Sequence, residues 1–223
     1  MDSRPTFDLP RPLRIGGLGL HLREWSDDDV ADLVALYDDP EIDRWTPVVS
    51  PFDTEAALAY LAAAEQKTAE RRSVQLAITT DGARPRGEIL LFPGTTDDRD
   101  VELAYGVGAP DRGRGLATRA VRLAVDFAHR RVGGRRVVLC IEDGNTASEA
   151  VARATGFVLT DDAPVVRTAK GRDVVLLTWN HREGDGPPLG LGTGPGDKAG
   201  PVEGRLLHPP AGSASGAGAG AVR

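Results

Sequence analysis

The sequence predicts a mixed α+β fold in which helices flank a mostly antiparallel central sheet that contains one parallel pair of strands. Two observations support this prediction. In the first half of the chain, short runs of alternating apolar and polar residues are separated by turn residues, which is typical of antiparallel strands. Further on, the apolar run 101–107, an amphipathic segment and the apolar run 136–141 follow one another, an order that predicts a βαβ unit with parallel strands.

Each strand is predicted from its own apolar pattern. Residues 73–79 alternate, and Asp81-Gly82 marks a turn to 86–92, which we expect to pair antiparallel with them. The run 136–141 is apolar throughout, as expected of a strand that is buried on both faces. Further strands are expected at 13–25, at 157–159, and in a hairpin of 165–167 and 173–179 around Lys170-Gly171.

The helices between these strands are predicted from capping residues and apolar spacing. Ser26 caps the first helix, Pro40 ends it, and the segment 41–52 is expected to be irregular. A second helix begins at Asp53 and ends near Arg71, and the others are expected at 114–132 and 145–156. The apolar stripe expected on the second helix consists of Ala57, Leu58, Leu61 and Ala64, and the capping box expected on the last helix consists of Thr146 and Glu149.

The composition is that of a globular protein of ordinary size. The 223 residues suffice for one domain, expected at 13–182, with a flexible leader at 1–12 and a disordered Gly-, Pro- and Ala-rich tail at 184–223. The net charge of −6 argues against general binding of nucleic acid. Because no apolar segment approaches the about 20 residues of a membrane helix and no signal peptide is evident, we expect a cytoplasmic protein without membrane contact. The single cysteine, Cys140, fits a reducing compartment.

A glycine-rich loop from Gly108 to Thr118 joins the strand at 101–107 to a long amphipathic segment that is expected to be helical. At a helix start several backbone N–H groups lack a partner, and with the positive end of the helix dipole they attract anions, above all phosphate. Arg112 and Arg114 add charge and forked donors. A Walker loop is excluded because no lysine follows Gly115, and a dinucleotide fold is excluded because mostly antiparallel strands precede the loop.

The hexapeptide Arg112-Gly113-Arg114-Gly115-Leu116-Ala117 matches the Gln/Arg-x-x-Gly-x-Gly/Ala signature of the GNAT superfamily of N-acetyltransferases. The chain from Leu20 to Trp179 resembles this family, and in particular its ribosomal-protein-alanine N-acetyltransferase branch, which is RimJ/RimL-like. The resemblance implies the GNAT fold, in which the parallel strands splay apart at the centre of the sheet and helices cover both faces. It also rests on Leu22-Arg23-Glu24-Trp25 with Asp28 and Asp29, and on Asn145-Thr146-Ala147-Ser148 with Gly156-Phe157.

The resemblance implies acetyl-CoA as the co-substrate. Its pantetheine arm is expected between the splayed strands, paired with Tyr105 to Val107, and a backbone N–H near Val107 would hold the acetyl oxygen and stabilise the oxyanion of the tetrahedral intermediate. Asn145 matches an asparagine that touches the cofactor, and it also fits a helix N-cap. The pyrophosphate is expected on the backbone N–H groups of Arg112, Gly113, Arg114, Gly115, Leu116, Ala117 and Thr118.

The resemblance further implies direct attack of a primary amine on the thioester in a ternary complex. Because the amine is mostly protonated at neutral pH, a base is needed, and Glu102 is the candidate, either directly or through water. The alternative is that Glu102 has no catalytic role and is an ordinary charged residue on the outward face of its strand. Many relatives use a tyrosine to protonate the leaving thiolate, but this chain has Ala152 at that position. Ser148 matches a serine of this branch and is the candidate acid. Its alternative role is a local hydrogen bond to the helix backbone.

The acceptor side is less defined. Tyr37 and Trp45 are expected to wall the acceptor site, although core packing explains both equally well. The amine is either a protein N-terminus or a small molecule, and a homodimer is considered. Two other functions stay open: a non-catalytic acyl-CoA-binding module, which the loss of tyrosine at Ala152 favours, and transfer of another acyl group. No metal is expected because the four histidines lack ligand spacing, and Cys140 is expected to be a structural thiol.

Overall fold

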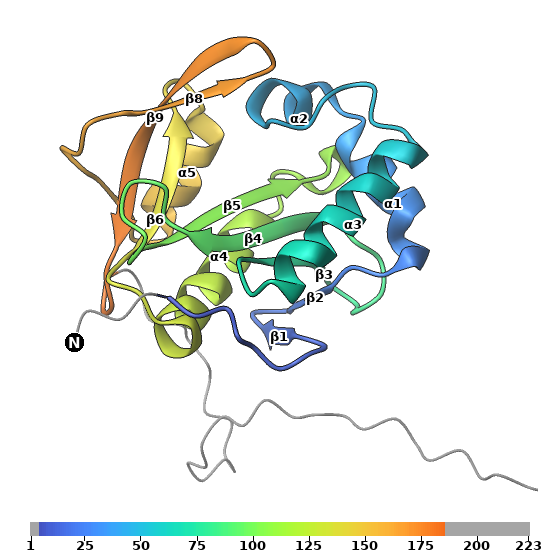
Figure 1. Ribbon diagram of the computed structural model, residues 1–223, viewed down its shortest axis with the longest axis horizontal. Helices are drawn as coiled ribbons and strands as arrows, with labels where there is room; N and C mark the ends of the chain where they lie inside the picture. Colours follow the sequence, from blue (N-terminus) through green and yellow to red (C-terminus); the bar gives the residue numbers. More distant parts are fainter. Residues whose placement is uncertain (1–4, 186–223) are drawn as a thin grey trace, which may run out of the picture. The chain divides into compact units, whose positions relative to one another are not determined.

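The structure, a computed structural model, describes residues 5–185. Within this range nine strands form one sheet in the order β1-β2-β3-β4-β5-β6-β9-β7, and β8 pairs with β9 (Figure 1). All neighbouring strands are antiparallel except β5 and β6, which confirms the predicted sheet. From residue 186 on, the expected tail lies outside the described residues. The strands are Arg14–Gly17 (β1), Leu20–Glu24 (β2), Val74–Thr79 (β3), Gly87–Pro93 (β4), Val101–Val107 (β5), Val137–Glu142 (β6), Val158–Leu159 (β7), Val165–Ala169 (β8) and Arg172–His181 (β9).

Helices cover both faces of the sheet, as the fold prediction requires (Figure 1). One face carries α1, α2 and α3, and the opposite face carries α4 and α5. The helices are Val30–Tyr37 (α1), Pro40–Trp45 (α2), Thr54–Ala69 (α3), Leu116–Phe127 (α4) and Thr146–Ala154 (α5). A π-helical turn at 128–132 continues α4, so that the predicted helix 114–132 is not α-helical throughout. In the described part of the chain no helix has the length and apolar content needed to cross a membrane.

The segment after Pro40 corrects one prediction, because it is not irregular throughout. Pro40 begins α2 instead of merely ending α1. The Asp39 side chain accepts hydrogen bonds from the backbone N–H groups of Glu41 and Ile42 at 3.0 and 3.1 Å. An aspartate cap followed by proline in the first turn is a favoured helix start, since proline has no N–H to satisfy and its φ is already helical.

Two further details of the helix predictions are wrong. Leu58 is 50% exposed, so it does not belong to the buried stripe of α3. The cap of α5 is Asn145 and not Thr146, because the Asn145 side chain accepts a hydrogen bond from the Ser148 N–H at 3.1 Å. The start of α3 is confirmed, with Asp53 accepting from the Ala56 N–H at 2.9 Å.

The parallel pair at the centre of the sheet is short. β5 and β6 are in register at Val101–Val137, Glu102–Val138 and Leu103–Leu139, and the pairing ends there. Both strands continue beyond this point, β5 to Val107 and β6 to Glu142. The predicted splay is therefore confirmed, and we call the space between the two diverging strand ends the gap.

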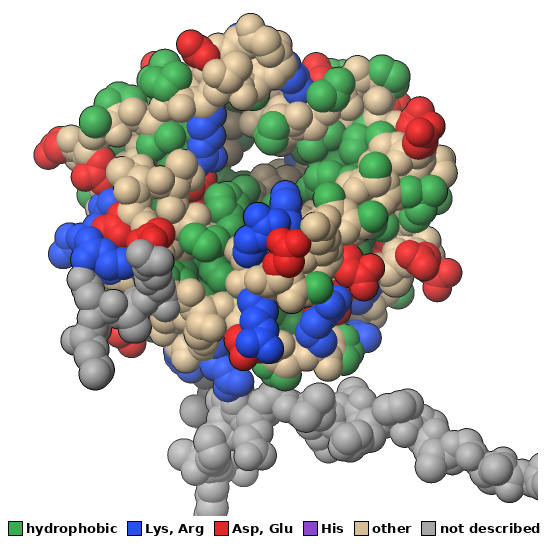
Figure 2. All heavy atoms as spheres, viewed as in Figure 1, with side chains coloured by type: hydrophobic (Ala, Val, Ile, Leu, Met, Phe, Trp, Pro, Cys, Tyr) green, Lys and Arg blue, Asp and Glu red, His purple; other side chains and the backbone are tan. Residues whose placement is uncertain are grey.

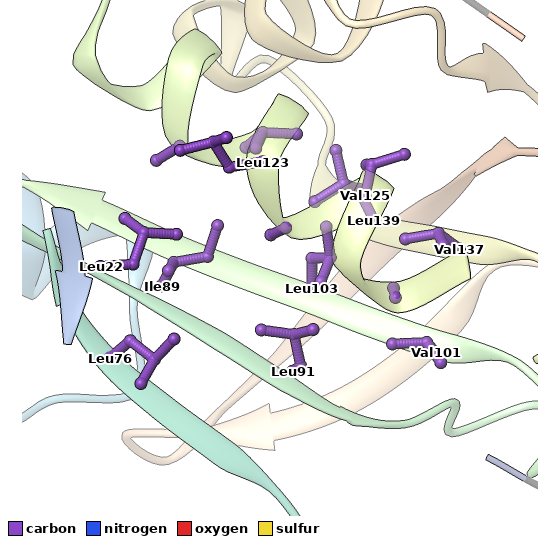
Figure 3. Packing of buried hydrophobic residues seen from close by; sticks show 14 of the residues in the cluster. Leu22, Leu76, Ile89, Leu91, Val101, Leu103, Leu123, Val125, Val137 and Leu139 are labelled. Atoms are coloured by element: carbon purple, nitrogen blue, oxygen red, sulfur yellow. The ribbon is translucent and has the colours of Figure 1, made fainter. Parts of the chain in front are cut away.

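The larger hydrophobic cluster lies between the sheet and α4. Leu103 of β5 and Leu139 of β6 face this helix, which contributes Leu123 and Val125 (Figure 3). All four side chains are buried. This packing fixes the direction of α4, and with it the direction in which the glycine-rich loop presents its N–H groups.

A second, smaller cluster packs α1, α2 and α3 together and contains Leu33, Ile42 and Phe52. Beneath it, the fully buried Glu88 of β4 accepts four side-chain hydrogen bonds. Burial raises the pKa of Glu88, and the four donors oppose that shift. The donors come from α1, α3, β3 and the segment after β2, so this one carboxyl group joins the helical layer to the sheet: Tyr37 OH, Tyr60 OH at 2.7 Å, Gln75 Nε2 at 2.7 Å and Trp25 Nε1 at 2.8 Å.

Candidate active site

The glycine-rich loop has the geometry of an anion-binding helix start. Gly113 and Gly115 adopt left-handed backbone conformations with φ of 72° and 70°, which only glycine adopts without strain. Gly115 is the N-cap of α4, and the first helical hydrogen bond runs from Arg119 N–H to Gly115 O at 3.1 Å. Among the described residues, nothing accepts from the N–H groups of 113–118. These N–H groups and the dipole of α4 therefore offer donors to a phosphate group.

The two loop arginines are held by carboxylates. Arg112 Nη2 lies 2.5 Å from Asp39 Oδ1, and Arg112 Nε donates to Val107 O at 3.0 Å. Arg114 Nη1 contacts Asp111 Oδ1 at 3.2 Å. Arg112 is thus held by the protein through both Nε and Nη2, whereas Arg114 contacts a carboxylate through Nη1 alone and its side chain is 64% exposed. The backbone N–H groups of the loop are free as well.

The diverging strands expose backbone donors to the gap. The Val101 N–H donates to Arg136 O at 2.9 Å, on the β6 side of β5. Backbone groups alternate in direction along a strand, so the N–H groups of Tyr105 and Val107 also point toward β6. Because β6 pairs with β5 only as far as Leu103, these two N–H groups open into the gap. The strand segment predicted to pair with a pantetheine arm therefore has the required free edge.

On the α4 and α5 face of the sheet, the first turn of α5 lies beside β5. The Tyr105 hydroxyl donates to Ser148 O at 3.5 Å, and burial raises the pKa of Tyr105 to about 12. Ser148 is half-buried, and within the described residues its hydroxyl has no hydrogen-bond partner. Ala152, in the next turn of the same helix, is fully buried. Asn145 caps the N-terminus of α5, which is one of the two roles expected for it from the sequence.

Glu102 projects from the opposite face of β5. Its side chain is 2% exposed and is paired with Arg167 of β8, whose Nη2 lies 2.8 Å from both carboxylate oxygens. The Thr95 hydroxyl donates to Glu102 Oε2 at 2.9 Å. Cys140 of β6 is close by: burial and then the Glu102 charge raise the pKa of its thiol to about 12, while the Arg167 charge lowers it. Glu102 and Ser148 therefore lie on the two faces of the sheet beside the gap.

The β8–β9 hairpin reaches across to α2. Lys170 Nζ at its turn lies 2.7 Å from Asp43 Oδ1. Arg172 Nη1 and Arg44 Nη1 both contact Oε1 of Glu142, at 3.0 and 3.1 Å. In Figure 2 the surface is hollowed between this hairpin, α2 and α3, and basic side chains line the rim. An acceptor can approach the gap through this hollow.

The two predicted acceptor residues occupy different environments. Tyr37 is buried, and its hydroxyl is engaged by Glu88 and by the Tyr60 hydroxyl at 3.1 Å. Trp45 is half-buried at the end of α2, where its indole N–H donates to Glu41 Oε2 at 2.9 Å and the Arg44 guanidinium stacks 4.1 Å from the ring centroid. Tyr37 is therefore closed off by burial, whereas Trp45 keeps part of its surface exposed at the end of α2.

Sequence reasoning missed the partners of Glu102. Arg167 is 65 residues away in sequence, and the hairpin carries no local signal that it bends toward β5. Thr95 lies in the polar turn between β4 and β5, where threonine is unremarkable. Glu88 was detectable in principle, because it is a charged residue within an otherwise apolar strand.

Comparison with known proteins agrees with this geometry. The family model described as an acetyltransferase (GNAT) domain matches residues 19–158. The chain therefore belongs to the GNAT acetyltransferase family. Among curated proteins, none matches the chain.

Solved structures confirm the expected likeness to the RimJ/RimL branch at the level of the fold. Mycobacterium smegmatis RimJ in complex with CoA-disulfide is 21% identical with a TM-score of 0.64, over 79% of this chain and 90% of that one. RimL, a ribosomal L7/L12 α-N-protein acetyltransferase bound to coenzyme A through a cysteine disulfide, is 16% identical with a TM-score of 0.64, over 76% of this chain and 98% of that one. The microcin C7 self-immunity acetyltransferase MccE, in complex with acetyl-CoA and AMP, is 15% identical with a TM-score of 0.63, over 74% of this chain and 93% of that one.

Proposed function

We propose that this protein is an acetyl-CoA-dependent N-acetyltransferase that transfers an acetyl group to a primary amine in a ternary complex. The observation that carries the proposal is the continuity of two donor sets. The free loop N–H groups at 113–118 lead directly to the free strand N–H groups of Tyr105 and Val107 in the gap. The first set suits a pyrophosphate, and the second suits the amides and thioester carbonyl of an acylated pantetheine arm. The solved CoA and acetyl-CoA complexes of RimJ, RimL and MccE support this ligand.

In the proposed reaction, the amine enters from the α1–α3 side through the hollow and attacks the thioester carbonyl in the gap. The Val107 N–H stabilises the oxyanion. Glu102 accepts the amine proton through water, because its own carboxylate is buried and is held in an ion pair with Arg167. Trp45 contacts the acceptor from α2.

The leaving thiolate receives its proton on the opposite face. We assign Ser148 as the donor because its hydroxyl is free and lies in the first turn of α5, which Asn145 caps beside the cofactor path. A serine hydroxyl is a weak acid, so much of the rate acceleration must come from holding the two substrates together. The adjacent Tyr105 hydroxyl, protonated at neutral pH, supports the same proton path.

The alternative of a non-catalytic acyl-CoA-binding module is favoured by one observation, the buried Ala152 at the position of the missing tyrosine. Thiol release from acetyl-CoA, measured with a panel of peptides and small amines, separates the two functions. We expect release to be matched by acetylated amine in mass spectra, and we expect Glu102→Gln to lower kcat. Tight CoA binding without turnover on any amine would instead establish the binding module. Faster release from a longer acyl-CoA would establish a different donor.

A further inference from the structure

Val107, whose N–H is the proposed oxyanion donor, lies in a weakly supported part of β5. Gly106 and Gly108 flank it, and glycine has the greatest backbone freedom of all residues. On one side, β6 pairs with β5 only as far as Leu103. On the other side, β4 bonds the neighbours of Val107, since the Gly108 N–H donates to Arg86 O at 2.9 Å. Because backbone groups alternate in direction along a strand, the N–H and C=O of Val107 both point away from β4.

Arg112 supplies a contact that holds this residue from outside the sheet. Its Nε donates to Val107 O at 3.0 Å, and its Nη2 lies 2.5 Å from Asp39 Oδ1. The guanidinium is planar and rigid, so two donors of one guanidinium keep their acceptors in a fixed mutual geometry. The Asp39 side chain is 14% exposed, so solvent screens this ion pair less than a pair on the open surface. The position of Asp39 therefore determines the position of the Val107 carbonyl.

Asp39 in turn belongs to the start of α2. Its Oδ1 atom also accepts from the N–H groups of Glu41 and Ile42 at 3.0 and 3.1 Å, so one oxygen both caps the helix and holds Arg112. The buried Ile42 packs on β5 as well, because its Cδ1 lies 3.3 Å from the point that a Cβ atom on Gly106 would occupy. α2 thus supports the end of β5 twice, through an ion pair and through packing.

The other end of α2 is held by β6 and the hairpin. Arg44 Nη1 lies 3.1 Å from Oε1 of Glu142, the last residue of β6. Next to it, Asp43 Oδ1 lies 2.7 Å from Lys170 Nζ of the β8–β9 hairpin. α2 therefore joins the ends of the two diverging strands on the α1–α3 side of the gap (Figure 1). Because the helix is held at both ends, Asp39 is a fixed point for Arg112.

We propose that Asp39 is a positioning residue for the acetyl transfer: through Arg112 it holds Val107 so that the oxyanion N–H faces the thioester carbonyl. This inference rests on the proposed function, which assigns Val107 its task. It also links the two substrate sites, since the residue that begins α2 on the acceptor side determines the geometry at the donor carbonyl. A misplaced oxyanion donor weakens binding of the developing negative charge more than binding of the uncharged thioester. Loss of the contact should therefore lower kcat more than cofactor affinity.

Asp39→Ser separates the contact with Arg112 from the capping of α2. Serine caps a helix about as well as aspartate does, but it carries no charge and its shorter side chain does not reach Arg112. The matched control is Asp53→Ser, the same change at the N-cap of α3, where the aspartate has no arginine partner within the described residues. Complete loss of an oxyanion donor costs about 100- to 1,000-fold in kcat. We expect kcat to fall about tenfold or more in Asp39→Ser and about twofold or less in Asp53→Ser, with Kd for CoA changed about threefold or less in both.

Two further measurements test whether Asp39 and Arg112 act together on the carbonyl. Arg112→Lys should resemble Asp39→Ser, because an ammonium group on a flexible stem does not hold two acceptors in a fixed geometry, and the double variant should be no slower than the slower single variant. The second measurement is calorimetry without an acceptor. The wild type should bind acetyl-CoA about threefold or more tightly than S-ethyl-CoA, in which a CH2 group replaces the carbonyl, and Asp39→Ser should lose this preference.

Kinetics and binding distinguish the ways in which the proposal can fail. Equal losses of kcat in Asp39→Ser and Asp53→Ser, or an unchanged preference for acetyl-CoA over S-ethyl-CoA in Asp39→Ser, would overturn the positioning role and leave the N-acetyltransferase function standing. If Asp39→Ser fails to fold, a severalfold lower kcat in Asp39→Asn, which keeps the cap without the charge, is the deciding result. Absence of turnover with every amine, despite CoA binding, would overturn the proposed function and the role of Asp39 together.

Discussion

Replacing Glu88 tests how the layer of α1, α2 and α3 is attached to the sheet. Trp25 Nε1 and Gln75 Nε2 can only donate, so Glu88→Met would leave two buried donors without an acceptor. Each such donor costs about 1–3 kcal/mol, which predicts a loss of about 2–6 kcal/mol in the free energy of unfolding. The two tyrosine hydroxyls can bond each other and add little to this cost.

Glu88→Gln is the matched control. Its amide oxygen can accept from Trp25 and Gln75, and its amide nitrogen can donate to the hydroxyl oxygens of Tyr37 and Tyr60, because a hydroxyl both donates and accepts. We expect this variant to lose about 1 kcal/mol or less. The comparison isolates hydrogen-bond satisfaction from the shape of the side chain.

The two variants also predict a pH effect. Burial raises the pKa of Glu88 above its ordinary value of 4.5, so the folded state holds the proton more tightly than the unfolded chain. The contribution of this proton to stability is complete below the unfolded pKa, and it is lost as the pH rises through the folded pKa. The difference in unfolding free energy between wild type and Glu88→Gln should therefore shift against the wild type as the pH rises from about 4 upward.

Urea unfolding followed by tryptophan fluorescence, at several pH values, measures these quantities. A Glu88→Met variant within about 1 kcal/mol of the wild type would refute the reasoning, since a buried unsatisfied donor cannot be that inexpensive. Equal losses in the Met and Gln variants would also refute it. In that case the volume of the side chain, and not its hydrogen bonding, would determine stability.

Three further predictions concern the cofactor side. Gly115→Asp should abolish CoA binding in calorimetry by placing a negative charge among the loop N–H groups, whereas Gly171→Asp, equally strained at φ 72° but in the hairpin turn, should bind CoA normally. Ala152→Tyr should lower the melting temperature and should not create a faster enzyme, because Ala152 is fully buried and overpacking costs about 1–3 kcal/mol. Cys140→Ser should retain thiol release from acetyl-CoA, since a thiol with a pKa of about 12 is not a nucleophile at neutral pH, and a loss of turnover of several orders would show that it takes part.

The parts of the fold that depend on local pattern could be predicted from the sequence. The strand, glycine loop, helix and strand from Val101 to Glu142 follow from apolar periodicity and from the handedness of βαβ units, and the structure contains them in that order. The start of α2 was missed although its signal, Asp39 before Pro40, was present. A proline that can end one helix can also begin the next, and only the geometry of the chain decides between the two.

The parts of the site that depend on tertiary contact could not be predicted. The exposure of Leu58 depends on what packs against α3, and its apolar character carries no such information. The pairing of Glu102 with Arg167 requires a bend of the β8–β9 hairpin that no single residue encodes. By contrast, the loop donors at 113–118 are backbone groups of a helix start, so local sequence was sufficient to locate them.

The two hydrophobic clusters share no member within the described residues, and this separation has an evolutionary consequence. One cluster holds α4 and the loop, while the other holds α1, α2 and α3. Substitutions at sites without shared contacts have nearly additive effects on stability. Core substitutions in the two clusters can therefore accumulate with nearly additive effects on stability. Changes at the polar contacts that join the helical layer to the loop, such as the ion pair of Asp39 with Arg112, are the ones expected to require a matching change on the other side.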